Sequence, residues 1–164
     1  LYAKGKNQLI FIRTDKINKS NYLTSSQIHS ISNNISIQSH SYNHENHFYL
    51  NDEQIKEQGI KSKNIIEDIT GSRVSDYSFP GGYWSLRCIK ILAENGYRNF
   101  FTSIPIFFRK KIYFNGIYLN IFGRVEVFSP GYKSIDDYFK INIRFLRSLR
   151  HLYSFTNAFI RSKA

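Results

Sequence analysis

Methionine is absent from this chain of 164 residues, and cysteine occurs only once, as Cys88. A single cysteine excludes an internal disulfide bond and a zinc site built from several thiolates. Cys88 shares a helical spacing with Ile89 and Leu92, so we expect its thiol to act as a small apolar group in the core. Because an initiator methionine is lacking, we also expect the chain to be a fragment of a longer protein, truncated at its amino end.

Long apolar runs and a secretory signal are also lacking. The longest apolar runs span only a few residues, which is too short to cross a bilayer, and the first residues contain no apolar signal region. Hydrophobic residues nevertheless make up 41% of the chain and aromatic residues 16%, which excludes a disordered protein. The length suffices for one domain with a hydrophobic core.

Acidic residues are few: 12 Asp and Glu stand against 23 Lys and Arg, which gives a formal net charge of +11. Such a charge is typical of proteins that bind nucleic acid, an anionic membrane or an acidic polymer, but it also occurs on ordinary solvated surfaces. No basic run alternates with stacking aromatic residues as in nucleic-acid-binding modules, so we expect no nucleic-acid partner.

Strand-like and helical segments alternate along the chain. We predict strands at residues 9–12, 35–39, 77–79, 99–102 and 124–128, and helices that begin near Thr24, Asn51 and Ser85. The continuous apolar run of residues 9–12 predicts a strand buried on both faces. Gln27 and Gln54 each follow a candidate N-cap by three residues, which is the pattern of a capping box. The alternation indicates βα units on a parallel sheet, where chemistry gathers at the carboxyl ends of the strands.

Two histidines, His40 and His44, follow the predicted strand at residues 35–39. Imidazole is the commonest protein ligand for zinc and similar ions, so two imidazoles four residues apart could bind one ion from one side. The turn of residues 80–82, Pro-Gly-Gly, follows another predicted strand and would lie at the same edge of the sheet. A third ligand has to come from elsewhere.

Other candidate residues near this pair have simpler interpretations. His47 could contact the outer shell of an ion or a substrate, but we expect an exposed loop histidine. Glu45 could likewise support the ion, although a plain loop carboxylate is favoured. His29 occupies a polar helix position and is expected at the surface.

Residues 133–164 have one long helical pattern, and we treat them as a basic amphipathic helix that follows a domain of residues 1–132. Its basic face is predicted to consist of Lys140, Arg144, Arg147 and His151. This face could bind an anionic membrane or cell-wall surface, but an exposed helix face without a partner is the favoured interpretation.

Several segments in a fixed order carry a family resemblance. Residues 21–28 read NYLTSSQI, 37–44 read IQSHSYNH, 62–71 end in a Thr-Gly pair, 79–82 read FPGG, 93–97 read AENGY and 123–127 read GRVEV. In this order they resemble motifs of the polysaccharide deacetylases, carbohydrate esterase family 4, among them YLTWxQI, IGSHTxxH, FxxPxG and AxxAGY. The resemblance covers about residues 1–130.

The resemblance implies an α/β fold, a distorted (β/α) barrel that lacks its first strand in this chain. It implies that His40 and His44 are ligands of a divalent metal, most often zinc. The family's TFDDG motif supplies an aspartate ligand and an aspartate general base, and it would lie upstream of Leu1. Arg124 is the candidate for the arginine that orients the catalytic aspartate. This chain by itself is therefore expected to be inactive.

The implied reaction is the removal of N-acetyl groups from a polysaccharide that contains N-acetylglucosamine, such as a cell-wall or capsular glycan. The substrate groove would be formed by Phe79, Pro80, Gly81, Gly82, Tyr83 and Trp84. The family also suggests a location at the cell envelope, either extracellular or periplasmic. Two alternatives stay open: an inactive relative that binds glycan, and a basic module for an anionic surface in which the histidines are incidental. The oligomeric state is not indicated.

Overall fold

Six strands form one sheet in the computed structural model, which describes residues 8–103 and 109–123. Their order across the sheet is β1-β2-β3-β4-β6-β5. The strands are β1 (Leu9–Ile12), β2 (Ser36–Ser39), β3 (Asp76–Ser78), β4 (Asn99–Thr102), β5 (Arg109–Phe114) and β6 (Ile117–Gly123). Neighbours from β1 through β4 to β6 are parallel, and only β5 runs antiparallel to β6. The predicted βα units on a parallel sheet are thereby confirmed.

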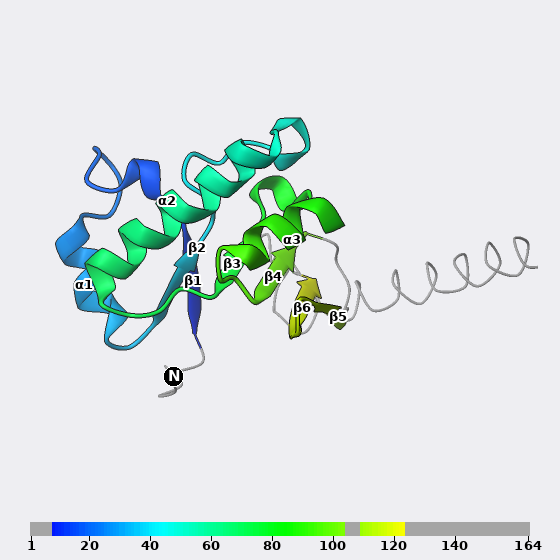
Figure 1. Ribbon diagram of the computed structural model, residues 1–164. Coiled ribbons are helices and arrows are strands. Elements are labelled where there is room, and N and C mark those ends of the chain that lie inside the picture. Colours follow the sequence, from blue (N-terminus) through cyan, green and yellow to red (C-terminus); the bar gives the residue numbers. More distant parts are fainter. Residues whose placement is uncertain (1–7, 104–108, 124–164) are drawn as a thin grey trace, which may run out of the picture. The chain divides into compact units, whose positions relative to one another are not determined.

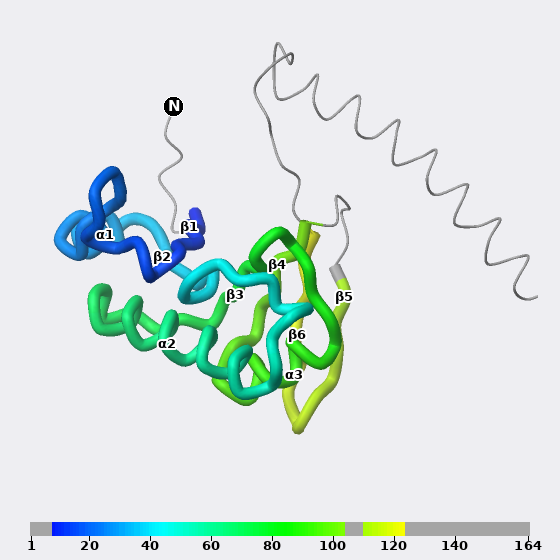
Figure 2. Tube along the Cα trace, turned by 90° about the horizontal axis from the view of Figure 1, so that it is seen from above, coloured from blue at the N-terminus to red at the C-terminus, as the bar shows by residue number. Residues whose placement is uncertain are grey.

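Three helices follow strands of this sheet: α1 (Ser25–Ser32), α2 (Asp52–Thr70) and α3 (Leu86–Glu94). Helix α2 lies between α1 and α3 and packs against both of them and against β2 (Figure 1, Figure 2). The two predicted capping boxes are present, at Thr24 with Gln27 and at Asn51 with Gln54. No helix in the described part of the chain has the length and apolar character that crossing a membrane requires.

The sheet face that the helices cover forms the hydrophobic core. Its fully buried side chains come from strands and helices alike: Tyr77, Phe79, Phe100, Leu119, Ile121, Ile28, Ile55, Ile66, Ile89 and Leu92. Cys88 is also buried, at 2% exposure, as predicted. On the opposite face the rings of Phe11 in β1 and Phe101 in β4 lie 4.8 Å apart, although β2 and β3 separate these strands. The sheet is therefore curled, as in part of a barrel.

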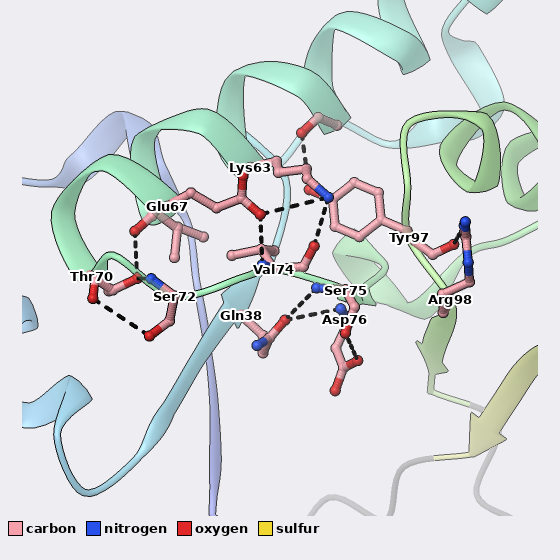
Figure 3. A network of polar contacts seen from close by, with 12 residues as sticks. Gln38, Lys63, Glu67, Thr70, Ser72, Val74, Ser75, Asp76, Tyr97 and Arg98 are labelled. Atoms are coloured by element: carbon pink, nitrogen blue, oxygen red, sulfur yellow. Dashed lines mark hydrogen bonds and ion pairs between the residues drawn. The ribbon is translucent and has the colours of Figure 1, made fainter.

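A polar network joins the end of α2 to the start of β3 (Figure 3). The Nζ of Lys63 donates a hydrogen bond to the carbonyl oxygen of Val74 at 2.8 Å, and the backbone nitrogen of Val74 donates to Glu67 at 2.8 Å. The side-chain oxygen of Gln38 accepts hydrogen bonds from the backbone nitrogens of Ser75 and Asp76 at 3.0 and 2.9 Å. These bonds tie the amino end of β3 to β2 and to α2.

One prediction about strands was wrong, and one pair of strands was not predicted. The strand at residues 9–12 is not buried on both faces: none of its four residues is fully buried, and Leu9 is 40% exposed. The hairpin of β5 and β6 was not predicted, although its turn is an Asn-Gly pair, Asn115-Gly116, with φ values of 47° and 80°. Such a turn is typical of a two-residue hairpin.

Several predictions lie outside the described residues. These are the strand at residues 124–128, the boundary at residue 132, the basic helix of residues 133–164 and the further strand expected before β1. They stay predictions.

Candidate metal centre

His40 and His44 lie at the carboxyl end of β2, with their rings in contact. The ring centroids are 4.8 Å apart and the ring planes are inclined by 73°. Zinc binds imidazole nitrogen at about 2.0–2.1 Å, so two imidazoles on one tetrahedral ion have centroids roughly 5 Å apart. The observed separation therefore suits two ligands of a single ion.

The ring of His40 is oriented by the backbone of β3. Its Nδ1 lies 2.7 Å from the carbonyl oxygen of Ser78. Because a carbonyl oxygen can only accept, Nδ1 carries the proton and the neutral ring has its lone pair at Nε2. Histidines that bind metals commonly donate their other nitrogen to a backbone carbonyl in this way. The donor set and its outer contact thus fit a divalent ion.

The loop between the two histidines has an unusual backbone. Ser41 and His44 adopt left-handed conformations, with φ values of 65° and 67°. A non-glycine residue there costs of the order of 1–3 kcal/mol and persists only where its surroundings hold it. The hydroxyl of Ser41 accepts a hydrogen bond from the backbone nitrogen of His44 at 2.9 Å, and Gln58 in α2 accepts two more from residues 42 and 43. The loop is therefore held in one conformation.

The turn Pro80–Gly82 follows the carboxyl end of β3, as predicted, and it approaches the chain after β4 closely. A Cβ atom at Gly82, whose φ is 74°, would lie 2.5 Å from the backbone nitrogen of Ser103. Only glycine fits this position without a shift of the backbone. The ring of Phe79, by contrast, is fully buried in the core, so it is not placed to contact a substrate.

Exposed aromatic rings stand beside this turn. Tyr83 is 55% exposed and its ring lies 6.2 Å from that of Phe48, which is 59% exposed. Trp84 is half-buried and packs against the core, so of the three aromatic candidates in the predicted groove only Tyr83 offers an open ring face. Phe48 was not predicted as part of this surface.

An ion pair at the same edge was also missed. Arg13 and Asp15 follow β1 closely. The Nη2 of Arg13 donates a hydrogen bond to the Oδ2 of Asp15 at 2.9 Å. The hydrogen bond from Arg13 holds the pKa of Asp15 below its usual value. The backbone nitrogen of Asp15 donates to the carbonyl oxygen of Tyr42 at 2.9 Å, so the pair lies beside the histidine loop. The position of both residues just after a strand was the available signal.

No third ligand accompanies the histidine pair within residues 8–103 and 109–123. Nowhere in these ranges do three His, Cys, Asp or Glu side chains come together in a way that could hold a metal ion. Arg124, the predicted orienting residue, lies outside the described ranges. The structure thus brings together two of the predicted site residues, with the glycine turn at the same edge of the sheet.

The prediction for His47 was wrong. Its side chain is fully buried, not exposed. Its Nδ1 bonds to the carbonyl oxygen of Glu45 at 2.9 Å and its Nε2 to the hydroxyl of Tyr77 at 2.7 Å. These bonds compensate the burial of both ring nitrogens. His29 and Glu45 are exposed, as expected.

Burial of His47 is expected to make the stability of the chain depend on pH. Burial lowers the pKa of His47, so the unfolded chain takes up a proton at this residue more readily than the folded chain. The free energy of unfolding should therefore decrease as the pH falls below about 6.5 and through the lowered pKa of the folded state. Urea denaturation between pH 8 and pH 5 measures this loss, and H47L should reduce it. An equal pH dependence in both proteins would contradict the prediction.

Comparison with known proteins shows which family the chain matches. The family model described as polysaccharide deacetylase matches residues 3–100. No protein with a curated description matches the chain. Among solved structures, the fold is similar to that of a polysaccharide deacetylase from Bacillus cereus, with 21% identity over 62% of this chain and 32% of that one, and a TM-score of 0.57.

Two further solved structures are similar. A deacetylase from Streptococcus pyogenes in complex with acetate has 17% identity over 58% of this chain and 43% of that one, with a TM-score of 0.56. A carbohydrate esterase family 4 pseudoenzyme from Bacillus anthracis has 22% identity over 56% of this chain and 32% of that one, with a TM-score of 0.51. The chain thus spans less than half the length of each.

These likenesses confirm the predicted fold class, an α/β fold of the (β/α) barrel type, of which the described strands form an open part. The family match extends over more than half of the chain and includes both histidines and the glycine turn. The chain belongs to the polysaccharide deacetylase family.

Proposed function

We propose that this chain supplies the metal-binding histidines and part of the substrate groove of a hydrolase that removes N-acetyl groups from a polysaccharide containing N-acetylglucosamine. The observation that carries the proposal is the contact between the rings of His40 and His44, whose centroids are 4.8 Å apart. Both residues follow the carboxyl end of β2, in a chain that matches the polysaccharide deacetylase family. The cell envelope, where such polysaccharides occur, stays the expected location.

Two histidines of this chain would hold a divalent ion, most commonly zinc in such sites. Bound there, the ion would lower the pKa of a water molecule toward neutrality and polarise the acetyl carbonyl. His40 would bind through Nε2, because its Nδ1 is committed to Ser78. The reaction also requires a general base and an acid for the leaving amine, and Arg124 stays the proposed orienting residue.

The remaining groove residues would position the sugar. Gly81 is exposed and Gly82 lets the turn pack closely against Ser103, and the exposed ring of Tyr83 beside this turn would stack on a sugar face. Phe48 would extend that surface. Pro80, Phe79 and Trp84 would support the groove from the protein side, since Pro80 and Phe79 are buried and Trp84 packs on the core.

A second candidate function is glycan binding without catalysis. It is supported by the two-histidine site, which has no third ligand in the described part of the chain, and by the fold similarity to a pseudoenzyme. The two candidates share a substrate and differ only in the release of acetate. The third alternative, a module for an anionic surface, depends on the basic helix of residues 133–164, which lies outside the described residues.

The test is zinc-dependent release of acetate from N-acetylglucosamine oligomers by the full open reading frame that contains these residues. Release that a chelator stops and added zinc restores would support the deacetylase. Oligomer binding without release would favour the inactive relative. Release that does not depend on His40 and His44 would overturn the metal centre.

Replacing Tyr83 by alanine is expected to raise KM for these oligomers by about 5- to 30-fold, because roughly 1–2 kcal/mol of apolar contact with the sugar is lost. If the protein is inactive, calorimetry should show a rise of the same size in the Kd for oligomers. Tyr118→Ala is a matched control. Tyr118 is 66% exposed, but it lies at the amino end of β6, whereas the glycine turn follows the carboxyl end of β3. Equal effects of both variants would contradict the assignment of Tyr83 to the groove.

A further inference from the structure

We propose that the buried pair of His47 and Tyr77 positions the histidine loop, residues 40–47, for metal binding. The inference rests on the metal centre proposed above and adds two positioning residues to it. His47 and Tyr77 are both fully buried, and a hydrogen bond of 2.7 Å joins the Nε2 of His47 to the hydroxyl of Tyr77. Neither side chain is placed to contact a substrate.

The hydrogen bonds of His47 have a single consistent direction. Its Nδ1 lies 2.9 Å from the carbonyl oxygen of Glu45, the residue after His44, and a carbonyl oxygen can only accept. The proton is therefore on Nδ1, and Nε2 accepts from the hydroxyl of Tyr77. Both ring nitrogens are used, so His47 acts on the metal site through the loop backbone and not as a ligand.

Strand β3 holds both ends of the loop through adjacent residues. At one end the ring of His40 donates to the carbonyl oxygen of Ser78, and at the other end the ring of His47 accepts from the side chain of Tyr77. Between these ends, Ser41 and His44 keep their left-handed backbone conformations. A loop held at both ends by a rigid strand can keep such conformations, and with them the relative placement of the two imidazoles.

Packing alone does not account for a polar pair at this position. The rings of Tyr77 and Phe79 lie next to His47, with centroids 5.7 and 5.8 Å from it, so an apolar side chain at this position would also have apolar neighbours. A buried hydrogen bond contributes little net stability compared with an apolar replacement of the same shape. What the hydrogen bonds add is direction, since they fix the carbonyl of Glu45 and hence the path of the chain next to His44.

The experiment is a titration of the full chain with Co²⁺, followed by its visible spectrum, and with Zn²⁺ in competition. H47L and Y77F are each expected to raise the Kd for metal by about 10- to 100-fold, the range found when residues outside the ligand set that orient a metal site are lost, and to change the Co²⁺ spectrum. H29A, which alters an exposed histidine of α1, should leave both unchanged.

The double variant H47L/Y77F separates positioning from stability. It removes both side chains of the buried His47–Tyr77 hydrogen bond, so that Nε2 of His47 is no longer left without a partner as in Y77F. It should therefore recover urea stability relative to Y77F while its metal affinity stays low. Recovery of wild-type metal affinity together with stability would overturn the inference, as would wild-type affinity in both single variants. If the wild-type chain bound neither metal, the proposed metal centre itself would fail, which is a distinguishable result.

Discussion

Replacing His40 or His44 by alanine is expected to abolish metal binding and to reduce kcat/KM for acetate release by about a thousandfold or more. Each histidine is half of the ligand set within the described residues, and the two rings lie in contact at 4.8 Å. Polarisation of a carbonyl and activation of water by a bound ion contribute several kcal/mol to a hydrolysis, and each 1.36 kcal/mol is about tenfold in rate. Metal content after dialysis and acetate release give the two readouts.

His29→Ala is the matched control for these variants. His29 is an exposed histidine on α1 whose Nδ1 bonds to the carbonyl oxygen of Ile69, away from the carboxyl edge of the sheet. It should keep wild-type metal content and activity. A His40→Ala protein that folds, binds zinc as the wild type does and releases acetate at the same rate would refute the centre. Loss of metal with unchanged oligomer binding would instead separate the groove from the metal.

Replacing Gly82 by alanine is expected to destabilise the chain by roughly 2–4 kcal/mol, since it combines backbone strain with overpacking. The φ of 74° disfavours any residue with a Cβ atom, and that atom would meet the backbone nitrogen of Ser103 at 2.5 Å. Backbone cannot move aside as cheaply as a flexible side chain. The turn after β3 should shift, so KM for oligomers should rise as well. Urea denaturation and oligomer binding measure the two effects.

Gly71→Ala isolates the contribution of the backbone strain. Gly71 ends α2 with a φ of 65°, and a Cβ atom there would meet nothing within 4 Å. Its replacement should cost only about 1 kcal/mol and leave oligomer binding unchanged. Equal losses of stability in both variants would show that the contact with Ser103 contributes nothing.

Local signals predicted much of the fold. The capping residues Thr24 and Asn51 fixed the starts of two helices, because an N-cap side chain acts on donors only two or three residues away. The apolar run at residues 9–12 gave a strand with correct bounds. The predicted burial of this strand on both faces was wrong, because the burial of a strand depends on segments far along the chain that pack against it. The hairpin turn at residues 115–116 carried a local signal that was overlooked.

The candidate site was predictable in part. His40 and His44 could be placed because their spacing and the preceding strand are local features. The burial of His47 could not be predicted, since it depends on the hydroxyl of Tyr77, 30 residues later in the chain. A histidine in a polar loop is ordinarily exposed, and only the tertiary partner reverses that expectation. The ion pair of Arg13 and Asp15 lies beside the histidine loop because β1 pairs with β2. The sequence spacing alone does not reveal which strands are neighbours.

The polar network of Lys63, Glu67 and Val74 lies at the amino end of β3, while the histidines and the glycine turn follow the carboxyl ends of the strands. The residues of this stabilising network and the candidate site residues thus lie at opposite ends of the strands. Exchange of the metal ligands His40 and His44 therefore leaves this network at the amino end of β3 in place. A variant without either histidine should therefore keep the fold while it loses the metal.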